Sequence, residues 1–208
     1  MKIVLASRNA HKIRELENFL RPVIQPLELL SLNDIQITDE IEETGTTFEE
    51  NAVLKARAAA SRGYISIADD SGLEVDVLGG EPGVYSARYA GEPCNDVRNN
   101  EKLLQKMAEV PEESRGAAFV SVIACILPWR ADEPIVARGI CRGVILTEPR
   151  GAGGFGYDPL FWYQPLCKTF AELSPEEKNS ISHRARAMEI FIRLIKETLD
   201  KYPIPEGF

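Results

Sequence analysis

A short run of carboxylates follows an apolar segment and is the part of the chain best suited to chemistry. Residues 65–73 read Ile-Ser-Ile-Ala-Asp-Asp-Ser-Gly-Leu. We expect a buried strand that delivers Asp69, Asp70 and Ser71 to its carboxyl end, after which Gly72 lets the chain turn away. Ligands bind at that edge of open α/β sheets, and adjacent carboxylates suit magnesium, which leaves its other positions to water and phosphate. An Asp- and Ser-rich turn without function is the alternative.

A second polar group stands between a predicted first strand and a predicted first helix. It reads Ser7-Arg8-Asn9-Ala10-His11-Lys12. A helix N-terminus after a strand is an anion site, because free N–H groups and the helix dipole point at the ligand. Lys12 would oppose that dipole, so phosphate binding explains it better than helix stability does. An ordinary Asn-capped helix stays open, whereas a P-loop is excluded because its motif is missing from the chain.

An acidic loop precedes the second predicted helix and ends in Glu42-Glu43-Thr44-Gly45. If this loop folds beside Asp70, one glutamate could complete a magnesium site with water and phosphate oxygens. A solvated acidic loop is the commoner meaning of such a run.

The glycine-rich segment 151–159, Gly-Ala-Gly-Gly-Phe-Gly-Tyr-Asp-Pro, matches the dinucleotide pattern Gly-x-Gly-x-x-Gly literally. That fingerprint should open a helix, but Pro159 biases the residue before it against helix, so we reject this interpretation. A flexible loop could instead present Phe155 and Tyr157 to a flat ligand, while main-chain amides and Asp158 read its edge, which suits a purine. A purely structural loop with Phe155 in the core is the alternative.

A further polar segment runs from Ser174 to Arg184. Ser174 should cap a short helical turn, and Ser182 should cap the last helix, with His183 and Arg184 in its first turn. Two cations at a helix start oppose the dipole, so either one could meet a phosphate or the polar edge of a base. An isolated histidine such as His183 is otherwise more often a surface residue.

The composition limits the possible partners. The chain has 208 residues, 44% of them hydrophobic, and a formal net charge of −8 from 24 basic and 32 acidic residues. This acidic balance argues against a nucleic-acid or anionic-membrane surface and leaves room for a small anionic substrate held by local cations or a metal. The four cysteines show no Cys-x-x-Cys spacing, no segment has the length and apolarity of a membrane span, and a reduced cytoplasmic setting is expected.

Apolar periodicity predicts an α/β chain, and its length allows one domain or two closely packed lobes. We expect strands at residues 2–7, within 26–32, at 65–73 and, as a hairpin pair, at 116–127 and 134–146. We expect helices from Asn9 to before Pro22, at 48–62, 96–108 and 182–199, and an irregular tail at about 202–208.

In this order, the segments resemble the inosine/xanthosine triphosphate pyrophosphatase family, whose members remove deaminated purine nucleotides. The matching stretches are Ser7–Lys12, Thr47–Lys55, Ala68–Leu73, Gly79–Ala90, Gly153–Phe161 and Leu173–Arg184. The resemblance implies hydrolysis of a nucleoside triphosphate to the monophosphate and pyrophosphate with Mg²⁺ as cofactor. It also implies a homodimer and a long mixed central sheet with flanking helices. Residues 1–208 would then form a single catalytic domain with two lobes around a substrate cleft.

The same resemblance assigns roles by position. Asp70 would be the general base for the attacking water and, with Glu42, a metal ligand, and Asp69 would support it. Ser7, Asn9, Lys12 and Lys55 would hold the triphosphate, together with the rest of that segment, Arg8, Ala10 and His11, and Ser71 would contact the substrate. Phe155, Gly156, Tyr157 and Asp158 would form the base-side loop, and Lys178, His183 and Arg184 would read the base.

Two points stay open within the resemblance. Arg8 replaces a glycine that many members carry, and it either turns outward or adds a phosphate contact. The choice of Glu42 over Glu43 depends on alignment across a variable loop. A pyrophosphatase for a modified pyrimidine nucleotide and an inactive nucleotide-binding regulator are the alternative functions.

Overall fold

The computed structural model describes the chain except for residues 9, 23, 40 and 206–208, and it leaves the side chains of residues 10–12 and 15 undescribed. In the described part, seven strands form one mixed sheet in the order β2-β1-β3-β4-β5-β6-β7. They are β1 (Lys2–Leu5), β2 (Glu28–Ser31), β3 (Ile65–Val75), β4 (Gly116–Ile126), β5 (Ile135–Ile145), β6 (Phe161–Tyr163) and β7 (Lys168–Thr169). Strand β1 is parallel to β2 and β3, whereas β5, β6 and β7 pair antiparallel. The predicted mixed sheet is confirmed.

The α-helices are α1 (Ala10–Leu20), α2 (Phe48–Ala60), α3 (Asp96–Lys106), α4 (Pro175–Ile181) and α5 (His183–Lys201). Short 3₁₀ segments lie at Asp76–Leu78, Gly83–Arg88, Glu112–Ser114, Pro128–Arg130, Gln164–Leu166 and Phe170–Glu172. The predicted helices and the β4–β5 pair are present, but the sequence did not predict β6 and β7. No helix among the described residues has the length and apolarity needed to cross a membrane.

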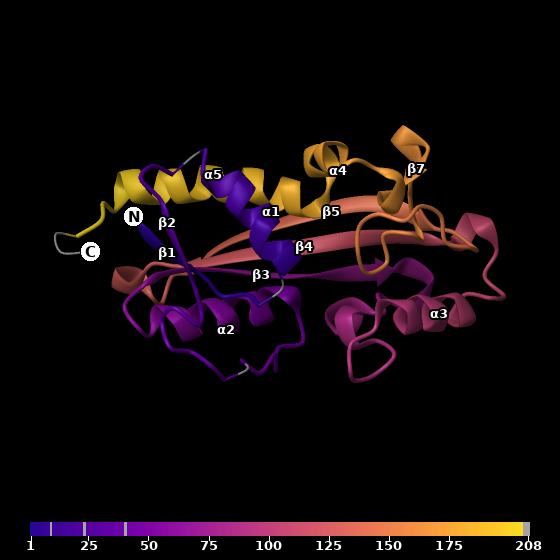
Figure 1. Ribbon diagram of the computed structural model, residues 1–208, viewed down its shortest axis with the longest axis horizontal. Coiled ribbons are helices and arrows are strands. Elements are labelled where there is room, and N and C mark those ends of the chain that lie inside the picture. The colour runs from indigo at the N-terminus through magenta and orange to yellow at the C-terminus, as the bar shows by residue number, and fades with distance from the viewer. Residues whose placement is uncertain (9, 23, 40, 206–208) are drawn as a thin grey trace. The chain divides into compact units, whose positions relative to one another are not determined.

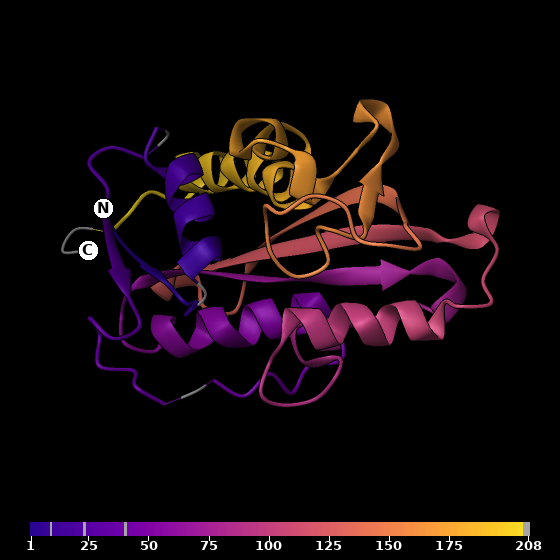
Figure 2. The same cartoon turned by 45° about the vertical axis from the view of Figure 1, so that its right-hand side comes forward.

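The chain divides into two compact units, of which the first comprises residues 1–70, 121–139 and 186–208. Within this unit, α1 and α5 lie on one face of the strands and α2 lies on the other (Figures 1 and 2). Its core joins alternate strand residues to the apolar faces of α1 and α5, because residues two apart on a strand share a face. The core includes Ile3, Leu5, Ile65, Ile67, Leu16, Leu20 and Phe191.

The second unit comprises residues 71–120 and 140–185. Within it, α3 covers one face of the strands, and α4 lies on the other face (Figures 1 and 2). Its core contains a group of aromatic rings: the Phe119 and Phe161 centroids are 4.6 Å apart, and those of Phe161 and Phe170 are 4.8 Å apart. Contacts of this kind add to the stabilisation from buried area.

The strand that carries the paired aspartates is longer than predicted. It continues to Val75, so Asp69 and Asp70 lie within β3 and not at its carboxyl end. The prediction that Gly72 turns the chain away was wrong, because Leu73 and Val75 are apolar and fully buried and keep the strand in the sheet. Strand β1 ends close to the two aspartates, because its last residue, Leu5, is opposite Ile67 of β3.

Helix α2 begins with a capping box. Thr47 is the N-cap: its hydroxyl accepts from the Glu50 N–H, and the Glu50 carboxylate accepts from the Thr47 N–H. Four of the last five residues are alanine, and alanine has the highest helix propensity. This helix carries Lys55 on the same buried face as Asn51.

Candidate active site

The first candidate cluster lies in the first unit and consists of Glu43, Lys55 and Asp70. The Lys55 ammonium donates to Asp70 Oδ1 and to Glu43 Oε1, each at 2.8 Å. The Lys55 and Asp70 side chains are 11% and 8% exposed. Burial alone would lower the pKa of Lys55, but the charges of Asp70 and Glu43 outweigh it and raise the pKa above the usual 10.5. Lys55 is therefore a fixed cation at neutral pH.

Helix α2 also positions Glu43, through the loop that precedes it. Asn51 Oδ1 accepts the Gly45 N–H at 2.8 Å, and the Glu50 carboxylate accepts the N–H groups of Thr46 and Thr47. A Cβ atom at Gly45 would lie 2.6 Å from Asn51 Oδ1, so this close approach requires glycine. The sequence analysis predicted neither the hydrogen bond between Asn51 and Gly45 nor the position that it gives to the Glu43 loop.

The two neighbouring glutamates occupy different environments. Glu43 is partly buried against Lys55, whereas Glu42 is exposed. The assignment of Glu42 as a metal ligand stays a prediction. The structure brings the other candidate, Glu43, to the lysine that holds Asp70.

The charge of this cluster suits a cation. One lysine faces two carboxylates, which leaves a formal negative charge in a mostly buried place. Among the described residues, no three His, Cys, Asp or Glu side chains gather closely enough to hold a metal ion by themselves. Magnesium is compatible with this set, because it binds through one or two carboxylates and draws its other ligands from water and phosphate.

Asp69 and Asp70 point to opposite faces of β3, as neighbours on a strand must. Asp70 meets Lys55 of α2, whereas Asp69, 1% exposed, accepts a 2.6 Å hydrogen bond from the Ser121 hydroxyl of β4. Ser121 carries no signal in the sequence, because it stands inside an apolar strand pattern. The two adjacent carboxylates therefore have different partners on opposite faces of the strand, and the supporting role of Asp69 stays a prediction.

The N-terminal polar segment is described in part. Asn9 lies outside the described residues, and the side chains of Ala10, His11 and Lys12 are likewise undescribed, so their phosphate-binding roles stay predictions. The backbone of residues 10–12 forms the start of α1, as predicted. The Arg8 guanidinium donates to the carbonyl oxygens of Thr38 and Asp39 at 2.6 and 2.8 Å. Arg8 thus turns towards the acidic loop and fastens its backbone.

The second candidate cluster lies in the second unit and consists of Phe155, Asp158 and Lys178. The Lys178 ammonium donates to Asp158 Oδ2 at 2.6 Å, and these side chains are 10% and 3% exposed. The same carboxylate oxygen accepts the Phe155 N–H at 2.9 Å. The ammonium also lies 4.6 Å from the centre of the Phe155 ring, within cation–π range. Three of the residues predicted to lie on the base side are therefore brought together.

The glycine-rich loop is more firmly held than the flexible loop that the sequence predicted. No helix follows it, which confirms the rejection of a dinucleotide fingerprint. Tyr157 is buried, and its hydroxyl donates to the Ser86 carbonyl at 2.8 Å. Gly156 has a positive φ of 61° and is bonded through its backbone to α3. Tyr157 is consequently a core residue that anchors the loop, and Phe155 is the loop's half-buried aromatic ring.

His183 and Arg184 are buried at the start of α5 and are not surface residues. The His183 ring stacks on Phe119, with centroids 4.9 Å apart and planes 15° apart. The Arg184 guanidinium donates to the Ser71 hydroxyl at 3.0 Å. The structure thus joins Arg184 to Ser71, the residue that follows Asp70 in the chain, a link that the sequence could not show because 113 positions separate them.

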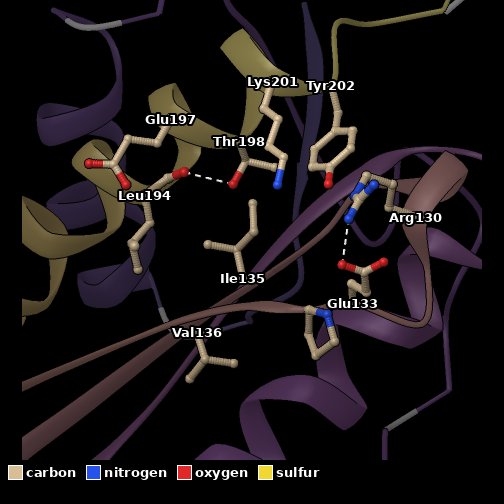
Figure 3. Close-up of a pocket in the computed structure, with 10 residues that line it drawn as sticks. Arg130, Glu133, Ile135, Val136, Leu194, Glu197, Thr198, Lys201 and Tyr202 are labelled. Atoms are coloured by element: carbon tan, nitrogen blue, oxygen red, sulfur yellow. Dashed lines mark hydrogen bonds and ion pairs between the residues drawn. The ribbon is translucent and has the colours of Figure 1, made fainter.

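A separate depression of about 450 Å³ lies in the first unit where α5 ends beside the start of β5 (Figure 3). The Arg130 guanidinium stacks 3.4 Å from the centre of the Tyr202 ring and pairs with Glu133. Lys201 and Glu197 also line it. None of the residues predicted to act on a substrate lines this depression, and its balanced charges favour no class of ligand.

Comparison with known proteins adds independent information. A family model for the Ham1 family matches residues 3–194. A dITP/XTP pyrophosphatase of Pseudomonas aeruginosa is 51% identical over 190 residues, which cover 91% of this chain and 94% of that protein. A dITP/XTP pyrophosphatase of Bacillus cereus is 47% identical over 188 residues, which cover 90% of this chain and 91% of that protein.

Solved structures agree. The Staphylococcus aureus Ham1 protein superimposes with a TM-score of 0.86 at 42% identity, covering 95% of this chain and 99% of that one. A nucleoside-triphosphatase, dITP/XTP pyrophosphatase, from Mycobacterium abscessus gives a TM-score of 0.77 at 42% identity, covering 98% of this chain and all of that one. On its sequence and its fold alike, the chain belongs to the Ham1 family.

Proposed function

We propose that this protein hydrolyses the deaminated purine nucleotides ITP, dITP and XTP to the monophosphate and pyrophosphate, and so removes them from the nucleotide pool. Its relatives named dITP/XTP pyrophosphatases match nearly the whole chain at about half identity. The observation that carries the proposal is the buried Lys55–Asp70 pair with Glu43 beside it. Such a pair supplies an oriented carboxylate and a fixed positive charge.

In this proposal Asp70 is the general base. A carboxylate within hydrogen-bond reach of a water molecule can accept its proton as the water attacks phosphorus. Lys55 orients that carboxylate, because its ammonium donates directly to Oδ1. The same positive charge suits the phosphate oxygens of the substrate, as do Ser7 and the predicted contacts of Asn9 and Lys12 at the start of α1.

We further propose that Mg²⁺ is the cofactor and that Asp70 and a glutamate of the acidic loop would hold it. The partly buried position of Glu43 against Lys55 favours it over the exposed Glu42. When bound, magnesium would neutralise charge on the phosphate oxygens.

The Lys178 cluster, His183 and Arg184 would bind the base in this proposal. Hypoxanthine and xanthine present a 6-oxo acceptor where adenine presents an amino donor, so a cationic donor favours the former. Lys178 is held by Asp158 and by the Phe155 ring, which fixes the direction of its remaining donors. Sites built to pair a substrate group discriminate strongly against a base that lacks it.

The remaining expectations belong to the same proposal. The protein would act as a cytoplasmic homodimer on a small-molecule nucleotide, without a nucleic-acid or membrane partner. Its formal charge of −8 supports the expectation that it binds neither nucleic acid nor an anionic membrane, because such surfaces usually show a basic excess.

The direct test is pyrophosphate release from ITP, XTP, dITP, GTP, ATP and a set of modified pyrimidine triphosphates, with and without magnesium. We expect turnover of ITP, dITP and XTP that requires magnesium, and much slower turnover of ATP. Equal turnover of ATP and ITP would contradict the proposal. Preference for a pyrimidine nucleotide would support the alternative pyrophosphatase, and binding without turnover would support the regulator.

A further inference from the structure

Helix α3 binds both backbone polar groups of Gly156 in the base-side loop, and so holds the two peptide groups that flank its Cα atom. Asp96 Oδ2 accepts the Gly156 N–H at 2.7 Å, and Asn100 Nδ2 donates to the Gly156 carbonyl at 3.0 Å. Asp96 and Asn100 are four residues apart, one turn along the same face of the helix. The two bonds therefore fix the position of Gly156 from a segment that is distant in sequence.

The neighbouring residue, Asn99, provides a comparison, because both ends of its side-chain amide are hydrogen-bonded and stabilise the fold. Its carbonyl accepts the Ala90 N–H at 2.7 Å, and its amide donates to the Ala87 carbonyl at 2.9 Å, so both ends are used. Asn100 differs, because its Oδ1 is buried and has no hydrogen-bond partner among the described residues. Leaving a buried acceptor without a partner reduces stability, so stability alone does not explain Asn100.

Helix capping does not explain Asp96 either. The N-cap of α3 is Asn95, whose side chain accepts the Arg98 N–H at 3.0 Å. An acidic residue in the first turn also favours the helix dipole, but Asp96 directs an oxygen to Gly156 instead of serving only as a charge.

Gly156 lies directly between Tyr157, whose ring is anchored, and Phe155, whose ring is half-buried. On one side, Tyr157 is buried and bonded to Ser86. On the other side, the Phe155 ring lies against the Lys178 ammonium. Gly156 has a positive φ, a conformation available to glycine at little cost, so an unclamped loop could rotate here. Ordering the loop before substrate arrives removes an entropic cost from binding.

We propose that Asp96 and Asn100 are positioning residues that fix the backbone on both sides of the Gly156 Cα atom and thereby orient Phe155 and Lys178 for the purine base. This inference rests on the proposed function. Because the two residues act on the base-side loop and not on Asp70, their loss should affect recognition of the base more than the hydrolytic step.

The test compares the double variant Asp96→Ala/Asn100→Leu with wild type. Loss of two hydrogen bonds that order the loop should raise the KM for ITP on the order of tenfold, lower the ITP-to-ATP ratio of kcat/KM, and change kcat little. Hydrogen exchange of the Gly156 amide should become faster. Inorganic tripolyphosphate, which has no base, should inhibit the variant and wild type with the same constant.

Two matched variants separate recognition from simple destabilisation. Asp96→Asn removes the charge but keeps an acceptor, and it should stay close to wild type. Glu101→Gln changes an exposed acid on the same helix and should have no effect. If the double variant does not fold, Asn100→Leu alone carries the test with the same expectations. Unchanged KM and base preference in a folded variant would overturn the inference, whereas a wild-type enzyme without preference for ITP would overturn the proposed function instead.

Discussion

The two candidate clusters are each built on a buried lysine–aspartate pair, yet they differ in charge. Lys55 is shared between Asp70 and Glu43, so negative charge is left over. Lys178 faces Asp158, which also accepts the Phe155 N–H, and two aromatic rings cover its ammonium. The first arrangement can attract a cation and still offer a carboxylate to water. The second is neutralised and rigid, which suits the orientation of hydrogen-bond donors. The same kind of pair is thus suited to different chemistry because its surroundings differ.

The largest effect should come from Asp70. We expect Asp70→Asn to reduce kcat by roughly 10²–10⁴-fold, the usual contribution of a general base, while nucleotide binding and folding persist. Steady-state kinetics and equilibrium binding of ITP measure the two quantities. Asp69→Asn is the matched control, and it should cost less, because Asp69 faces Ser121 on the other side of β3. Equal losses from the two variants would mean that the neighbours act as one unit.

The next effect concerns Lys178 and is seen in stability. Lys178→Met removes the ammonium that pairs with the buried Asp158 carboxylate, which should lower the free energy of unfolding by about 3–5 kcal/mol. Adding Asp158→Asn should recover most of this loss, since the amide oxygen can still accept the Phe155 N–H. Urea unfolding of the single and double variants measures both changes. Failure of the double variant to recover would show that packing, and not charge, determines the loss.

Magnesium should distinguish the two acidic-loop candidates. We expect Glu43→Gln to raise the magnesium concentration for half-maximal activity by about tenfold or more, a typical loss for a group that supports a metal. Glu42→Gln, the adjacent and exposed control, should change it little. Titration of activity with MgCl₂ gives both values. A larger increase for Glu42→Gln than for Glu43→Gln would identify Glu42 as the ligand.

The smallest effect is the pH dependence of the Lys55 cluster. The pKa of Lys55 is raised in the folded protein, so the lysine stabilises the fold fully below its unfolded pKa of about 10.4. That contribution is lost as the pH rises through the higher folded value. Urea unfolding at pH 8 and above pH 11 should therefore show a difference between wild type and Lys55→Met that shrinks at high pH. A difference that grows with pH would contradict the sign of the shift.

Local patterns predicted the elements well. The caps at Ser174 and Ser182, helix α2 and the β4–β5 pair could all be predicted, because each depends on neighbours within a few residues. The end of β3 could not be predicted locally. Gly72 looked like a turn, but burial of Leu73 and Val75 in the core of the second unit keeps the strand extended.

The candidate site divides in the same way. The chemistry of Asp70, Lys55 and Lys178 was indicated by their types and by the family resemblance. The residues that hold neighbouring parts of the two clusters, Asn51, Ser121 and Asn100, were not indicated. Polar residues within apolar or helical patterns give no signal until their hydrogen-bond partner is known.

By itself, the sequence predicted a kind of chemistry: carboxylates for a metal and a water, cations for phosphate, and an aromatic loop for a base. It did so because residue type sets charge and donor capacity in any fold. Only the tertiary structure decided how the equivalent neighbours divide their roles. Asp70 meets Lys55 and Asp69 meets Ser121, because strand geometry sends adjacent side chains to opposite faces. Glu43, not Glu42, reaches Lys55 because α2 fastens the preceding loop.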